Sequence, residues 1–124
     1  MRIQKFEDLI SWQKGKLLFV ELNKCFYNEK DYFFKDQLLR AALSVSNNIA
    51  EGFDRKSDKE LTQFLIIARG SCAEVRSMIY IAQAVNKLNL EQKQYFIDLT
   101  DEISRLLTGF VQKLATSDKR LGTS

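Results

Sequence analysis

Proline and histidine are both absent from this chain of 124 residues, and glycine occurs only five times. Proline and glycine are the residues that most often interrupt helices, so long helices meet few obstacles in this sequence. A β-rich fold would need more turn-forming residues than the chain contains. The scarcity of such residues therefore predicts an all-α protein.

The absence of histidine also limits the chemistry. Histidine is the usual proton carrier near neutral pH and the commonest metal ligand, and Glu-x-x-His pairs build the di-iron sites of four-helix proteins. Gly52, Gly70 and Gly109 are isolated from one another, so the chain has no glycine-rich phosphate loop. We expect no enzyme activity, cofactor, metal or small-molecule substrate. A carboxylate-only metal site that uses Glu51 and Glu74 for hydrolysis is the catalytic alternative.

Cysteine and long apolar runs are scarce as well. Cys25 and Cys72 lie far apart within apolar helical patterns, which predicts buried free thiols in a reducing compartment. The N-terminal segment carries acidic residues and lacks the continuous apolar run of a signal peptide. No stretch approaches the about 20 apolar residues that span a bilayer. We expect a cytoplasmic protein without a membrane partner.

Four segments show apolar residues at the three-and-four spacing of an amphipathic helix. The third has the most regular pattern, a heptad seam of Leu61, Leu65, Ala68, Cys72, Val75, Ile79 and Ala82. In the fourth, the seam is predicted to be Phe96, Leu99, Ile103, Leu106 and Phe110. Short polar connections predict an antiparallel, up-down-up-down four-helix bundle in a single domain, 1–124. The expected helices span about 7–28, 32–51, 57–87 and 90–116, followed by a mobile tail at 117–124.

Three residue patterns mark the expected helix ends. Asp31 is a suitable N-cap for the second helix. Ser57 followed by Glu60 forms a capping box directly before an apolar run. Gly52 fits the left-handed position that closes a helix at its C-terminal end.

A polar stripe follows one face of the second expected helix. Its members stand at three-and-four spacing, and the third helix offers three further polar residues at comparable height. Ion pairs of Arg40 with Glu74 and of Glu51 with Arg69 would then cross between the helices. An internal hydrogen-bond network or a solvated face explains the stripe as well as a contact with phosphate or a partner protein does. The stripe and its surroundings comprise Gln37, Arg40, Ser44, Asn47, Asn48, Glu51, Arg69, Ser71 and Glu74.

The third helix carries a second apolar strip beside its seam. The two strips together make an arc wider than the roughly 100° stripe of a surface helix. Either this helix is the most buried of the four, or the second strip forms an interface between subunits. The candidate interface residues are Phe64, Ile67, Met78, Ile81 and Val85.

The chain has a net charge of +3, and basic residues outnumber acidic ones in its first thirty residues. Such a bias is compatible with phosphate contacts and equally with solvated helix faces. The candidate basic surface consists of Lys5, Lys14, Lys16 and Lys24.

Several motifs together resemble a known family. They are Phe6-Glu7-Asp8-Leu9, Trp12-Gln13-Lys14, the block from Gln37 to Gly52 that contains Arg40-Ala41-Ala42 and Asn48-Ile49-Ala50-Glu51-Gly52, and the block from Phe64 to Ser71. These residues resemble the four-helix bundle proteins encoded within 23S rRNA intervening sequences. That family is similar to the accessory variability determinant of diversity-generating retroelements, a ring-shaped homopentamer that binds nucleic acid and the reverse transcriptase of the element.

The resemblance implies a bundle, a pentameric assembly and a set of signature residues. The set consists of Trp12, Arg40, Ser44, Asn47, Asn48, Glu51, Gly52, Arg69, Gly70, Ser71 and Glu74. The chain departs from the family where Leu39 replaces a common basic residue and Ser46 replaces a common proline.

The leading hypothesis is therefore a non-catalytic homo-oligomeric scaffold, most simply a pentamer, that contacts RNA, DNA or a protein that handles nucleic acid. The alternative is a protein–protein interaction module that does not bind nucleic acid.

Overall fold

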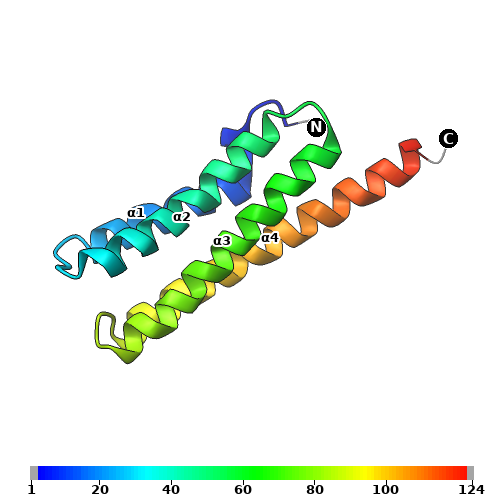
Figure 1. Ribbon diagram of the computed structural model, residues 1–124. Coiled ribbons are helices and arrows are strands. Elements are labelled where there is room, and N and C mark those ends of the chain that lie inside the picture. The colour runs from blue at the N-terminus through cyan, green and yellow to red at the C-terminus, as the bar shows by residue number, and fades with distance from the viewer. Residues whose placement is uncertain (1–2, 123–124) are drawn as a thin grey trace.

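The computed structural model describes residues 3–122, with side chains through residue 116. After a short 3-10 turn, η1 (Phe6–Asp8), the chain forms α1 (Ile10–Cys25), α2 (Tyr32–Phe53), α3 (Asp58–Ala84) and α4 (Leu90–Gly122). Each helix packs on the next one, and α1 also packs on α4. Figure 1 shows the resulting up-down-up-down arrangement. The predicted all-α four-helix bundle is confirmed.

The core is built from one stripe on each helix. All seven residues of the predicted α3 seam are buried, and Leu65, Val75 and Ile79 have no exposed surface. Full burial of such a side chain contributes roughly 1.5–3 kcal/mol. The α3 seam therefore outweighs any single polar contact in the bundle.

The seam of α4 differs at one position from the sequence prediction. Leu107 is fully buried, whereas Leu106 is only half-buried. The core-facing residues of α4 include Phe96, Leu99, Thr100, Ile103 and Leu107, so the step after Ile103 is four residues and not three. Thr100 satisfies its buried hydroxyl by donating to the carbonyl oxygen of Ile97 at 2.9 Å.

Both predicted N-terminal caps are confirmed. The backbone N–H of Phe34 donates to the Asp31 carboxylate at 3.1 Å at the start of α2. At the start of α3, the N–H of Glu60 donates to the Ser57 hydroxyl oxygen at 3.2 Å. The same hydroxyl donates to the Glu60 carboxylate at 3.2 Å. Each cap stabilises its helix by about 1 kcal/mol.

Gly52 does not have the role predicted from the sequence. It lies inside α2, is buried, and has no left-handed backbone conformation. A Cβ atom at Gly52 would lie 2.5 Å from the Cβ atom of Phe64, so glycine is needed for the close approach of α2 and α3. The left-handed residue is Asn86, with φ of 65°.

Asn86 ends α3 through a Schellman motif. The N–H of Lys87 donates to the carbonyl of Ala82 at 2.7 Å, and that of Asn86 donates to Gln83 at 3.1 Å. These two bonds satisfy carbonyl groups that the end of the helix would leave without partners.

All four helices have ends that differ from the expected ones. α1 ends at Cys25 and not at 28, α2 at Phe53 and not at 51, and α3 at Ala84 and not at 87. α1 begins only at Ile10, because the buried Leu9 is extended and separates the helix from η1. α4 continues to Gly122, so residues 117–122 are helical where a non-helical tail was expected. No proline or glycine occurs between Gly109 and Gly122 to stop the helix. Residues 123–124 of the expected tail lie outside the described residues.

Lys87 forms ion pairs that join the α3–α4 loop to the α1–α2 loop at one end of the bundle. Its ammonium group lies 3.1 Å from the Glu29 carboxylate and 3.4 Å from that of Asp31. The pKa of Glu29 is lowered, first by the N–H of Asp31 and then by Lys87. The pKa of Asp31 is lowered chiefly by the N–H of Phe34, and that of Lys87 is raised chiefly by Glu29.

Among residues 3–122, no helix is long and apolar enough to cross a bilayer.

Gly52→Ala is expected to destabilise the protein by about 1–3 kcal/mol, because the added methyl group overlaps Phe64. Gly70→Ala is the matched control, since a Cβ atom there meets nothing within 4 Å. The control should raise stability by about 0.5–1 kcal/mol through helix propensity. Urea unfolding followed by circular dichroism measures both. Equal effects of the two substitutions would contradict the close contact of α2 with α3.

Removal of Lys87 is expected to change how stability depends on pH. The carboxylates of Glu29 and Asp31 have lowered pKa values, so they stabilise the fold above the ordinary carboxyl pKa values and lose this effect as the pH falls through their folded values. Below about pH 4, the free energy of unfolding should fall less steeply in Lys87→Met than in the wild type. Lys30→Met, an exposed substitution in the α1–α2 loop, is the control and should keep the wild-type slope.

Candidate polar site between α2 and α3

A small hydrogen-bond network joins α2 to α3 near the middle of the bundle. The hydroxyl oxygens of Ser44 and Ser71 lie 2.9 Å apart. The side-chain amide of Asn48 donates to the backbone carbonyl of Ser44 at 2.8 Å and to its hydroxyl oxygen at 2.9 Å. Three of the predicted site residues thus form one half-buried network, which fixes the height of α2 relative to α3.

A hollow of about 210 Å³ lies beside this network. Arg40 and Glu74 both line it, but they form no ion pair within 4 Å in the described structure. The predicted Arg40–Glu74 pair is therefore wrong, although both side chains reach the same hollow. The remaining lining residues are Gln37, Ala41, Ser44 and Ser71.

Glu51 and Arg69 are not brought together either. The Glu51 carboxylate lies 3.8 Å from the Arg55 guanidinium, near the end of α2. Arg69 faces α4, where its guanidinium donates to the Thr108 hydroxyl at 3.1 Å. Asn47 is exposed on α2, outside the network.

The register of α2 and α3 also separates Glu51 from Glu74. Because Ser44 is level with Ser71 and the helices are antiparallel, the two carboxylates lie about 15 Å apart along the bundle axis. The described residues contain no group of three or more acidic or cysteine side chains that could hold a metal ion. This geometry does not support hydrolysis by a metal held between Glu51 and Glu74.

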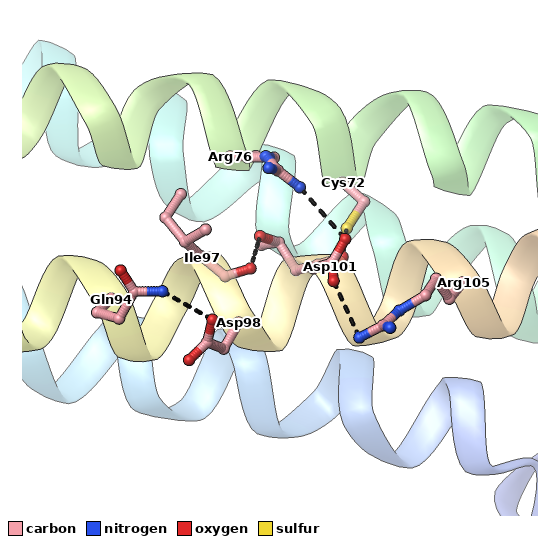
Figure 2. Close-up of polar contacts among 8 residues, drawn as sticks. Cys72, Arg76, Gln94, Ile97, Asp98, Asp101 and Arg105 are labelled. Atoms are coloured by element: carbon pink, nitrogen blue, oxygen red, sulfur yellow. Dashed lines mark hydrogen bonds and ion pairs between the residues drawn. The ribbon is translucent and has the colours of Figure 1, made fainter.

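A second set of polar contacts joins α3 to α4, and the sequence analysis did not identify it. Figure 2 shows Asp101 between two arginines: Arg76 of α3 at 3.5 Å and Arg105 of α4 at 2.9 Å. The four-residue spacing of Asp101 and Arg105 was a signal for that pair. Nothing in the spacing indicated that Arg76 would reach the same carboxylate from another helix.

Cys72 lies beside this contact and is held as a thiol. Its Sγ donates to the carbonyl oxygen of Thr100 at 3.2 Å. Burial is the main reason that the pKa of Cys72 rises to about 12, and Asp101 acts in the same direction. Burial also raises the pKa of the half-buried Cys25. Neither thiol is therefore poised as a nucleophile near neutral pH.

The four candidate basic residues differ in the groups that lie near their ammonium groups. Lys14 lies 3.5 Å from Glu102 of α4, and Lys24 lies 3.5 Å from Glu21 on its own helix. The Lys16 ammonium lies 5.8 Å from the centre of the Trp12 ring. Lys5 is exposed before η1.

The second apolar strip of α3 is exposed along most of its length. The side chains of Ile67, Ile81 and Val85 are 51%, 49% and 54% exposed. Met78 is half-buried against the core. Phe64 is also half-buried, and the Arg55 guanidinium lies 4.7 Å from the centre of its ring. Sequence analysis missed Ile66 and Tyr80, which extend the exposed apolar surface toward α4.

Comparison with known proteins assigns the family. The model of the 23S rRNA-intervening sequence protein family matches residues 7–109. The chain belongs to the 23S rRNA-intervening sequence protein family. The resemblance inferred from its sequence motifs is thereby confirmed.

One solved structure has a fold similar to that of this family member. It is a protein of unknown function of the S23 ribosomal protein family from Bacteroides thetaiotaomicron, with a TM-score of 0.77 and 23% sequence identity. The similarity covers 82% of this chain and 98% of the other. At this identity the likeness supports the fold alone. No curated protein matches the chain.

Arg69 and Arg40 are expected to differ in their effect on stability. Arg69→Ala should destabilise the protein by about 1–2 kcal/mol, because it removes a half-buried bond and leaves Thr108 without that donor. Arg40→Ala, at an exposed position, should change stability by less than about 0.5 kcal/mol. Thermal unfolding of the two variants measures the difference. A larger loss for Arg40→Ala would mean that Arg40 is an internal structural group.

Proposed function

We propose that this 23S rRNA-intervening sequence protein is a non-catalytic scaffold that assembles into a homo-oligomeric ring, a pentamer as the family resemblance implies, and presents basic side chains to RNA or DNA. The observation that carries the proposal is the row of exposed apolar side chains on α3, including Ile67, Ile81 and Val85. Apolar surface of this extent is usually covered by a partner.

The non-catalytic part rests on how the polar groups are used. Ser44, Asn48 and Ser71 bond to one another, and the raised pKa of Cys72 keeps its thiol protonated. The chain has no histidine to move protons near neutral pH. These features favour a structural role for the polar groups between the helices.

The nucleic-acid part rests on the lysines of the N-terminal segment and α1: Lys5, Lys14, Lys16 and Lys24. The ion pairs of Lys14 and Lys24 are at partly exposed positions and contribute at most about 1 kcal/mol each. A phosphate group can therefore compete for either ammonium. A ring would repeat this set in every subunit and so increase avidity without further contacts.

A protein-interaction module is the second candidate. The hollow beside Arg40 and Glu74 favours it, because both charged groups reach the surface there without pairing with each other. A partner protein with a complementary pair of charges would use both groups.

Binding to a structured RNA is expected to weaken with salt. Between about 50 and about 200 mM salt the affinity should fall at least about tenfold, because lysine contacts release counterions from the phosphates. The double variant Lys5→Ala/Lys24→Ala should bind more weakly and show a shallower salt slope. Lys56→Ala/Lys59→Ala removes equal charge at exposed positions near the start of α3 and is the matched control. Fluorescence anisotropy measures each affinity.

Two results would contradict the proposal. Light scattering that finds a monomer at micromolar concentration removes the ring. Undetectable RNA and DNA binding, or binding that is indifferent to salt, removes the nucleic-acid part. An assembled protein without nucleic-acid binding would favour the protein-interaction module.

A further inference from the structure

The exposed face of α3 has bulky apolar side chains at both ends and mostly small side chains in the middle. Ile66 and Ile67 lie toward its start, and Tyr80, Ile81 and Val85 lie toward its end. The residues exposed between these ends are Gly70, Ala73, Glu74 and Ser77. Three of these four side chains are small, so a neighbouring helix could approach closely there. Glu74 is the one charged side chain among the exposed residues of α3 from Ile66 to Val85.

Packing of this face against the same face of a second copy is disfavoured. Glu74 lies midway between Ile67 and Ile81, so a two-fold axis at the centre of the face would bring two Glu74 carboxylates together. Like charges that meet at an interface cost several kcal/mol. A head-to-tail contact, in which α3 meets a different surface, avoids this repulsion.

α1 offers such a surface on the opposite corner of the bundle. Ile10, Leu17 and Val20 are exposed apolar side chains on its outward side. Lys16 lies among them and lines a hollow together with Glu7, Trp12, Gln13, Leu17 and Val20. Among the described residues, Lys16 has no carboxylate within 4 Å. This face is thus largely apolar, with Lys16 beside Val20 and the exposed Lys24 one helical turn beyond it, whereas the α3 face is apolar with one acidic group.

The two faces also agree in height along the bundle. A Cβ atom at Gly15 would lie 3.4 Å from Ser46 and Val45 of α2, and Ser44 touches Ser71 of α3. Val45 and Ser46 follow Ser44 on α2, which runs antiparallel to α3, so Gly15 is roughly level with Arg69 and Gly70. Because α1 and α3 run in the same direction, later residues keep this offset.

This register places bulky groups of α1 opposite small groups of α3 in a neighbour that stands side by side. Leu17 is level with a point between Gly70 and Ala73, and Val20 is level with a point between Ala73 and Ser77. Lys16 is within one helical turn of the height of Glu74, which the long lysine side chain spans.

We propose that the exposed α1 face of one copy receives the exposed α3 face of the next copy, with Lys16 paired to Glu74 across the contact. The inference rests on the proposed ring and names its contact surfaces. It assigns Lys16 to the subunit interface and leaves Lys5, Lys14 and Lys24 for phosphate. Each copy contacts one neighbour through its α3 face and the other neighbour through its α1 face. Repetition of this contact builds a ring when the last copy meets the first.

Charge reversal tests the pair. Lys16→Glu and Glu74→Lys should each weaken assembly by about tenfold or more, because each single change creates a like-charge contact. The double variant Lys16→Glu/Glu74→Lys should restore assembly to near the wild-type level. Lys30→Glu, an exposed change of equal charge in the α1–α2 loop, is the control and should assemble normally. Light scattering over a concentration series measures each assembly.

A bulky side chain at Gly70 tests the close approach. The Cβ position of Gly70 meets nothing within 4 Å in its own chain, so Gly70→Gln should fold with unchanged or higher melting temperature and lose assembly. Gly109→Gln is the matched control, since the Cβ position of that exposed α4 glycine is also open. It should assemble as the wild type does.

The outcomes separate this contact from the proposed scaffold. A monomeric wild type contradicts both. An assembled wild type that Lys16→Glu does not weaken, or a double variant no better than the single ones, overturns the contact alone. Loss of assembly in Gly70→Gln together with stronger assembly in the charge-neutral Glu74→Gln would indicate packing of α3 on α3 instead.

Discussion

The buried seam of α3 is the packing constraint on which the rest of the structure depends. Its seven residues face the centre of the bundle, and α3 packs against both α2 and α4. A helix can turn only part of its circumference toward its neighbours, so the apolar residues of α3 that exceed this stripe remain outside. The same helix therefore holds the bundle together and supplies its largest exposed apolar face.

Features that depend on residues close in sequence were predictable. The Asp31 and Ser57 caps and the α3 seam follow from local spacing, and the structure confirms all of them. Gly52 was assigned wrongly because its role depends on Phe64, which belongs to another helix. Leu107 was missed because a seam can shift by one residue where the partner helix decides which side is covered.

The candidate site shows the same limit. Helical spacing correctly placed Ser44 and Asn48 on one face, and the antiparallel pairing brought Ser71 to them. It could not show that Arg69 turns toward Thr108 of α4, because several faces of α3 carry polar residues. Spacing also could not predict that Ile67 is exposed whereas Met78 packs against the core. The height of one helix against another and its rotation about its own axis depend on contacts that no single segment contains.

The ion pairs between Lys87 and the α1–α2 loop influence where the helices of the bundle can separate. Lys87 joins the α1–α2 loop to the α3–α4 loop, so both helical hairpins are tied at that end. The opposite end has the α2–α3 connection, η1, which packs on α1 and α2, and a hollow of about 740 Å³ beside Leu106, Phe110 and Leu114, where α4 extends past the start of α3 (Figure 1). Regions with fewer buried contacts open first. We therefore expect the helices to separate first at the end that carries the α2–α3 connection, while the two loops joined by Lys87 act as the hinge.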